Sequence, residues 1–216
     1  ITMAQAVTAR SLISNATEVS YSLSDTTANL VSTASGLPAV LTASTNVVAT
    51  TVANVADAAT LLASVNGTTG TATYDIAVTT AATFTDTATF NGARNITVTA
   101  AVGASIDATQ AGFLLGRTNS GTTTIARVSG TAGDIAALAS AKGANETITA
   151  IEATGNSSVA NIRTLQGMSS SVTYSLQDTA ANLAAAGDAV LNGATQLRLV
   201  ATGTGATATL AQLAII

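Results

Sequence analysis

Apolar and polar residues alternate in short stretches along this chain, and each stretch is followed by a helical pattern. Residues 95–100 (Asn-Ile-Thr-Val-Thr-Ala) show the clearest alternation, which is typical of a β-strand with one buried face. A corner of small residues comes next, and residues 107–115 then read as a short helix that begins at Asp107. The glycine-containing residues 116–121 lead to the next alternating stretch, so one unit is strand, corner, helix and return loop.

The unit recurs with a period of about 25 residues, which is typical of a solenoid whose repeats bury their apolar faces against one another. We therefore expect an α/β repeat solenoid with about eight units, in which parallel strands stack and short helices or helical turns lie on the opposite side. Residues 1–216 would form a single elongated repeat domain, with a partial N-terminal unit at 1–17 and the repeats at 18–216. The expected strands are residues 19–23, 46–52, 73–78, 95–100, 123–128, 146–151, 172–176 and 196–200.

Three Asn-Gly pairs are expected to mark return loops, because glycine adopts a positive φ without steric cost. They are Asn66-Gly67, Asn91-Gly92 and Asn192-Gly193.

Two distant decapeptides are nearly identical. Residues 21–30 (Tyr-Ser-Leu-Ser-Asp-Thr-Thr-Ala-Asn-Leu) return at 174–183 as Tyr-Ser-Leu-Gln-Asp-Thr-Ala-Ala-Asn-Leu. Their second halves, at 25–30 and 178–183, resemble the Asp-Thr-Ala-x-Asn-Leu repeats of large secreted bacterial surface proteins that are similar to adhesins. The resemblance implies a stacked-repeat fold and an extracellular structural or adhesive role. It does not extend to calcium binding, because the chain lacks the Gly-Gly-x-Gly-x-Asp pattern of the calcium-binding repeats.

Composition narrows the classes of function. Only 8% of the residues are charged, the net charge is −4, and the seven basic residues are scattered, so no basic patch is expected to bind nucleic acid. A surface so poor in charge favours self-association. No apolar run of about 18 residues, the length of a membrane-spanning helix, is present.

The residues available for catalysis or metal binding are few. The chain has no His and no Cys, and its eleven acidic residues are dispersed, so we expect no enzyme, cofactor or metal site. An aspartate ladder through the repeats, including Asp57, would suit a polysaccharide-degrading enzyme or a calcium site. Helix capping is the preferred interpretation, because a carboxylate before a short helix accepts its free N–H groups. The expected caps are Asp25, Asp107, Asp134 and Asp178.

The sequence offers two kinds of candidate site for sugars, namely asparagines that could be glycosylated and tyrosines that could bind a glycan. Of the five Asn-x-Ser/Thr sequons, those at Asn66 and Asn145 fall in expected return loops and are the candidate glycosylation sites. Tyr21, Tyr74 and Tyr174 occupy related strand positions and could stack on a glycan, although packing within the repeat is the preferred interpretation.

Both ends of the sequence are expected to lie within a repeat unit rather than to cap the array. This makes the chain a processed product or a piece of a longer array, and uncapped ends favour head-to-tail contact between copies or with adjoining repeats. We therefore expect a non-enzymatic, extracellular or cell-surface subunit or segment of a bacterial fibre, surface layer or adhesin. The alternatives are a glycan-binding adhesive module and a parallel-β polysaccharide-degrading enzyme. The expected assembly residues are Ile1, Met3, Val7, Leu210, Leu213, Ile215 and Ile216.

Overall fold

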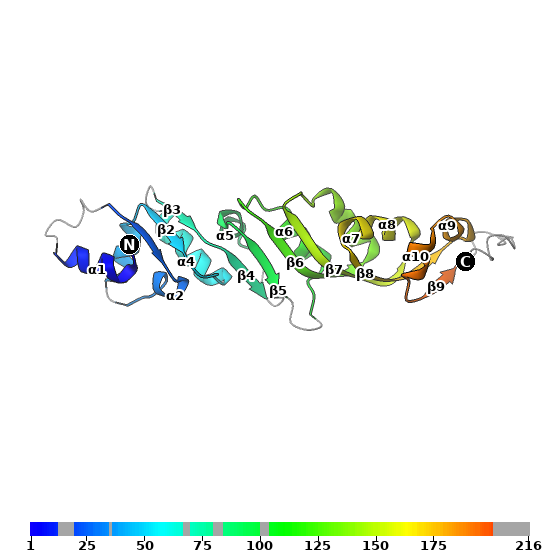
Figure 1. Cartoon of the computed structure of the whole chain (residues 1–216), viewed down its shortest axis with the longest axis horizontal. Helices are drawn as coiled ribbons and strands as arrows, with labels where there is room; N and C mark the ends of the chain where they lie inside the picture. Colours follow the sequence, from blue (N-terminus) through cyan, green and yellow to red (C-terminus); the bar gives the residue numbers. More distant parts are fainter. Residues whose placement is uncertain (13–19, 35, 67–69, 80–83, 100–103, 201–216) are drawn as a thin grey trace. The chain divides into compact units, whose positions relative to one another are not determined.

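The computed structural model describes all residues except 13–19, 35, 67–69, 80–83, 100–103 and 201–216. The chain divides into two units, each of which is described by itself. Unit 1 comprises Ile1–Thr99 and Arg117–Thr123, and unit 2 comprises Ala100–Gly116 and Thr124–Ile216. The fold is mixed α/β, and the strands pair in parallel, which confirms that part of the expected architecture (Figure 1).

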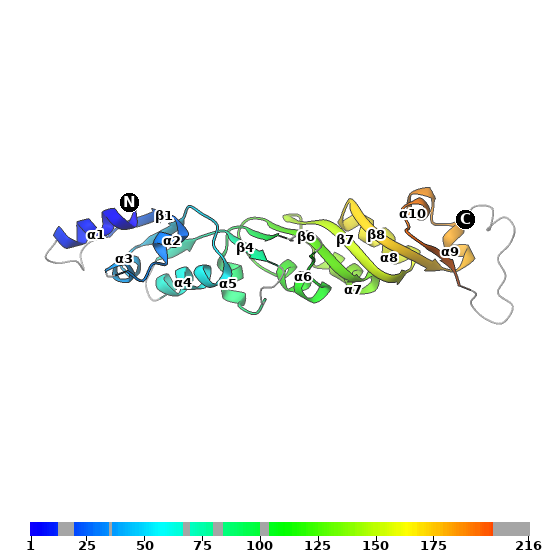
Figure 2. The same ribbon diagram turned by 90° about the horizontal axis from the view of Figure 1, so that it is seen from below.

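Unit 1 alternates short strands with helices. Its elements in chain order are α1 (Met3–Leu12), β1 (Ser22–Asp25), α2 (Thr27–Leu30), α3 (Leu37–Thr42), β2 (Asn46–Ala49), α4 (Val55–Asn66), β3 (Thr71–Thr73), β4 (Ile76–Thr79), α5 (Thr87–Gly92) and β5 (Ile96–Thr99). The strands pair in the order β1-β2-β3, and β4 pairs with β5. Helix α1 contacts α3, α3 contacts α4, and α4 contacts α5 (Figure 2).

The strand register follows the repeat. Ser22 pairs with Asn46, 24 residues further on, and Asn46 pairs with Thr71 after 25 more. Ile76 pairs with Ile96, a step of 20 residues. The strands of a parallel sheet cannot be joined by tight hairpins, so each step must contain a crossover, which here contains a helix.

Unit 2 follows the same order of elements. It contains α6 (Ala108–Leu115), β6 (Thr123–Thr131, whose first residue belongs to unit 1), α7 (Ala132–Ala136), the 3₁₀-helix η2 (Ala137–Ser140), β7 (Glu146–Ser157), α8 (Val159–Met168), β8 (Ser171–Asp178), α9 (Ala180–Ala184), α10 (Asp188–Asn192) and β9 (Leu197–Leu199). The strand order is β6-β7-β8-β9. Helix α8 contacts α7 and η2 on one side of the series and α10 on the other.

The core of each unit consists of the inward positions of the strands together with the apolar faces of the helices. In β4 and β5, Ile76 lies beside Ile96 and Val78 beside Val98, and all four are at most 1% exposed. The Thr residues between them on β5 are exposed. The alternation of apolar and polar residues at 95–100 therefore predicts correctly which side of β5 is buried.

The observed strands differ in their bounds from all eight expected strands, and the first expected strand, residues 19–23, corresponds to β1 at Ser22–Asp25. Residues 46–52 form a strand only to Ala49, because Thr51 instead accepts the N–H of Thr27 with its hydroxyl. Residues 73–78 are interrupted at Tyr74 and Asp75, where Asp75 accepts bonds from Arg94. Strand β7 continues well beyond the expected residue 151, to Ser157.

Ser157 is a polar residue in an apolar position of the core of unit 2. Its side chain is 2% exposed, and its hydroxyl is a buried polar atom without a hydrogen-bond partner among the described residues. We expect Ser157→Ala to raise the free energy of unfolding by about 1 kcal/mol, because the unfolded state no longer gains by hydrating this hydroxyl. Urea denaturation measures the change.

Ser44→Ala is the matched control for this prediction. Ser44 is equally buried, but its hydroxyl donates to the carbonyl of Leu41 at 2.7 Å. Its removal should lower stability by about 1 kcal/mol. A loss of stability in Ser157→Ala comparable to that in Ser44→Ala would contradict the assignment of an unsatisfied hydroxyl.

Candidate functional site

The repeated decapeptide forms the same structure at both of its positions. In unit 1, Asp25 ends β1 and accepts hydrogen bonds from the N–H of Thr26 (2.8 Å) and from the side-chain amide of Asn29 (2.8 Å). In unit 2, Asp178 ends β8 and accepts them from the N–H of Thr179 (2.8 Å) and the amide of Asn182 (2.7 Å). The sequence identity of the two copies therefore extends to their hydrogen bonds.

The second carboxylate oxygen of each aspartate reaches the helix that precedes its strand. Asp25 accepts the N–H of Met3, the first residue of α1, at 3.0 Å. Asp178 accepts the N–H of Val159, the first residue of α8, also at 3.0 Å. An N–H in the first turn of a helix has no partner within the helix. Each aspartate thus joins the end of one strand to the start of the helix before it in the chain.

The expected helix caps need correction at three positions. The N-caps of α2 and α9 are Thr26 and Thr179, whose hydroxyls accept the N–H of the asparagine three residues later. Asp25 and Asp178 lie one residue before these caps. Asp134 lies inside the first turn of α7, where the hydroxyl of Thr131, the actual N-cap, donates to its carboxylate.

Two further helix starts complete the pattern. Asp107 is the N-cap of α6 and forms a capping box with Gln110, with bonds of 2.7 and 3.0 Å. Asp57 lies in the first turn of α4 and receives a bond from the side chain of Asn54. The five aspartates that the repeat relates therefore all accept hydrogen bonds where helices begin.

The charges of Asp25 and Asp178 are stabilised by these bonds. Burial raises the pKa of each carboxyl, and the bonds from the asparagine side chain and from two backbone N–H groups lower it by more. The net result is a pKa below the ordinary value in both, as expected when hydrogen-bond donors favour the charged form.

Asp75 is a strongly bonded carboxylate that the sequence pattern did not single out. Arg94 donates to both of its oxygens, at 2.9 and 2.7 Å, and Asn95 donates with its backbone and side-chain N–H groups. The Arg94 guanidinium lowers the pKa of Asp75 more than burial raises it. The side chain of Asn95 is engaged further, because its oxygen accepts the N–H of Thr122.

The three tyrosines pack inside the repeats. Tyr21, Tyr74 and Tyr174 are 9%, 0% and 2% exposed. Their hydroxyls donate to backbone carbonyls in α3, α5 and α10, those of Val40, Thr89 and Val190, at 2.7, 2.9 and 2.8 Å. Their rings are therefore covered, and none offers a face on which a sugar could stack.

In two of the Asn-Gly pairs, glycine is required by the closeness of a tyrosine hydroxyl rather than by a left-handed turn. A Cβ on Gly92 would lie 2.6 Å from the hydroxyl oxygen of Tyr74, and one on Gly193 would lie 2.5 Å from that of Tyr174. Gly193 has a φ of −80°, and Gly92 has no positive φ either, so the expected reason for glycine is wrong at both positions. Gly67 lies outside the described residues.

The hydroxyl of Tyr74 should resist ionisation. Burial and the nearby Asp86 raise its pKa to about 12. A pKa raised in the folded state stabilises the fold fully below the unfolded value of about 10, and this stabilisation is lost as the pH rises through the folded value. We expect the part of the phenolate absorbance that Tyr74→Phe removes to appear together with unfolding above about pH 10, and the alkaline slope of stability to be smaller in Tyr74→Phe. Titration of Tyr74 near its ordinary pKa in the intact fold would contradict this.

The other candidate residues are dispersed. Ile1 is 51% exposed, Met3 is only 2% exposed and Val7 is half-buried, so Met3 belongs to the core and not to an assembly surface. Asn66 is the last residue of α4 rather than part of a loop, and Asn145 is exposed in the turn before β7. Leu210, Leu213, Ile215 and Ile216 lie outside the described residues.

A partly polar hollow lies in unit 2 beside the starts of α6 and α7. It has a volume of about 510 Å³, and Asp107, Ser129, Asp134 and Leu138 are among its lining residues. Within the described ranges, no three acidic side chains are grouped as a metal site would require. No helix in the described part of the chain has the length and apolar content needed to cross a membrane.

Comparisons with family models, with curated proteins and with solved structures find no match to this chain.

Proposed function

We propose that the chain is a non-enzymatic structural protein, a solenoid of stacked strand–helix repeats that acts as a self-associating subunit or a segment of an extracellular bacterial fibre, surface layer or adhesin. The observation that carries the proposal is the matched pair of aspartates. Asp25 and Asp178 each join a strand end to the start of the helix before it by the same three kinds of donor. In both copies the aspartate therefore holds two successive elements of the repeat together.

The strand register and the helix contacts support the solenoid. Paired strands are 20 to 25 residues apart in unit 1, as Ile76 with Ile96 and Asn46 with Thr71 illustrate. Each unit has a series of helices in contact with their neighbours. In a stacked array of this kind each repeat is stabilised by its neighbours rather than by one central core.

A structural role also agrees with the use of the charged residues. Asp25, Asp107 and Asp178 accept hydrogen bonds at helix starts, and Asp75 is paired with Arg94. These carboxylates stabilise the fold, which supports a role in assembly over one in catalysis. The location outside the cell rests on the resemblance of residues 25–30 and 178–183 to repeats of secreted surface proteins.

Light scattering and electron microscopy of the purified protein test the proposal. Particle mass should increase with protein concentration, and elongated assemblies should be visible. A protein that stays monomeric and compact at every concentration would contradict self-association.

A further inference from the structure

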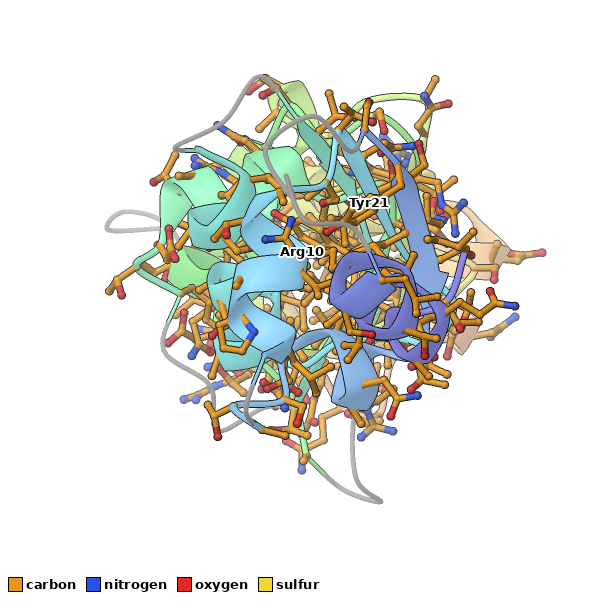
Figure 3. All side chains as sticks on the ribbon, turned by 90° about the vertical axis from the view of Figure 1, so that its left-hand side faces the viewer. Arg10 and Tyr21 are labelled. Atoms are coloured by element: carbon orange, nitrogen blue, oxygen red, sulfur yellow. The ribbon has the colours of Figure 1, made fainter. Side chains whose placement is uncertain are left out.

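Helix α1 carries an exposed face, and two positions of this face are buried in the counterpart helix of unit 2. This outer face of α1 consists of Ala4, Gln5, Thr8, Ala9 and Leu12, which line an open hollow of about 450 Å³. Leu12 is 80% exposed, more than any other large apolar side chain that is described as exposed. Figure 3 looks onto unit 1 from the side of α1, with Arg10 of this helix and Tyr21 labelled.

The equivalence of α1 and α8 follows from their hydrogen bonds. Both have ten residues, the first N–H of each is bound by the aspartate of the decapeptide, and each contacts the strand that carries this aspartate. Helix α1 contacts α3 where α8 contacts α10. Met3 therefore corresponds to Val159, and the following positions correspond in order.

In α8, two of the five positions equivalent to the outer face are buried, whereas Ala160 and Thr164 are exposed and Asn161 is partly exposed. Leu165 and Met168, the counterparts of Ala9 and Leu12, are 0% and 8% exposed. Helix α8 contacts α7 and η2 of the preceding repeat, and Asn161 approaches Gly133 of α7. In unit 2, the helix that corresponds to α1 is therefore contacted by another strand–helix repeat of the same chain.

Ile1 extends the equivalence to the strands. Its amino group donates to the carbonyl of Ser22 at 2.8 Å, and its carbonyl accepts the N–H of Ser24 at 3.0 Å. It therefore lies beside β1 as Ser157 lies beside Leu176 of β8. A repeat that covered α1 would continue both the helix contacts and the parallel strand pairing.

We propose that the outer face of α1 is a docking surface for the β9 side of a second copy of this chain, an inference that rests on the self-association in the proposed function. Among the described residues, strand β9 is the last strand in the pairing order of unit 2, and its two leucines, Leu197 and Leu199, are 40% and 42% exposed. A strand in that position is a template for further pairing. The contact joins two different surfaces, so it does not close on itself and generates a linear polymer.

Two single substitutions and one control test this proposal by sedimentation velocity over a range of concentrations. Leu12→Asp and Leu197→Asp each place a charge in the contact and should weaken association at least about tenfold. Val52→Asp, at a position 57% exposed elsewhere in unit 1, should associate like the wild type. All three positions are exposed, so the circular dichroism melting curves should remain unchanged.

A mixture of the two single variants gives the decisive result. The Leu12→Asp copy keeps an intact β9 side and the Leu197→Asp copy an intact α1 face, so the mixture should form dimers and nothing longer. Assembly of the wild type with no effect of Leu12→Asp would overturn the docking surface and leave the proposed function standing. Recovery of no dimer in the mixture would overturn the pairing of α1 with β9. A wild type that remains monomeric would overturn the proposed function and the docking surface together.

Discussion

Replacing Gly92 or Gly193 with alanine is expected to lower the free energy of unfolding by about 2–4 kcal/mol. The added Cβ would lie 2.6 Å from the hydroxyl oxygen of Tyr74 in the first case and 2.5 Å from that of Tyr174 in the second. Both rings are buried, so neither hydroxyl can move away without losing its bond to a backbone carbonyl. The cost therefore combines steric strain with a buried polar group deprived of its partner.

A control and a rescue separate this effect from the general effect of alanine. Gly167 lies inside α8 without a positive φ, and a Cβ there meets nothing within 4 Å. Gly167→Ala should therefore raise stability by about 1 kcal/mol, as glycine-to-alanine changes in helices do. Combining Gly92→Ala with Tyr74→Phe removes the clashing oxygen, so the double variant should lose less than the sum of the two single losses. Urea denaturation gives all four values, and equal stability of Gly92→Ala and Gly167→Ala would contradict the argument.

The sequence was sufficient to predict features that depend on one local preference. Alternation at residues 95–100 identified β5 and its buried side, and an aspartate before a small-residue helical pattern identified the N-cap of α6. The near identity of residues 21–30 and 174–183 indicated equivalent structures, and their matching hydrogen bonds agree with this interpretation.

Features that depend on distant partners could not be predicted. Asp25 and Thr26 are both good N-cap residues, and only the position of Met3 decides that the aspartate binds α1 while the threonine caps α2. An Asn-Gly pair suggests a turn, but the need for glycine at Gly92 comes from the ring of Tyr74. The exposed face of α1 could not be recognised from the sequence, because the exposure of Leu12 is informative only in comparison with its buried counterpart Met168.

Asp178→Ala is expected to be the most damaging change of a charged residue in unit 2. The carboxylate accepts bonds from the N–H of Val159 (3.0 Å), the N–H of Thr179 (2.8 Å) and the side-chain amide of Asn182 (2.7 Å). Alanine leaves the two partly buried backbone N–H groups and the exposed amide of Asn182 without this acceptor, which should cost about 2–4 kcal/mol in urea denaturation at neutral pH. Asp188→Ala is the control, because Asp188 lies exposed in the first turn of α10, and its loss should change stability by less than about 0.5 kcal/mol.

The pH dependence of this loss distinguishes the charge of Asp178 from the packing of its side chain. Burial raises the pKa of Asp178, but its hydrogen bonds lower it by more, so the folded-state pKa lies below the ordinary value. A lowered pKa gives a stabilisation that is complete above the unfolded value of about 3.9 and is lost as the pH falls through the folded value. The stability of the wild type and that of Asp178→Ala should therefore converge in acid. A difference that stays constant from neutral pH to the most acidic pH at which both remain folded would mean that the ionised carboxylate does not join the strand to the helix.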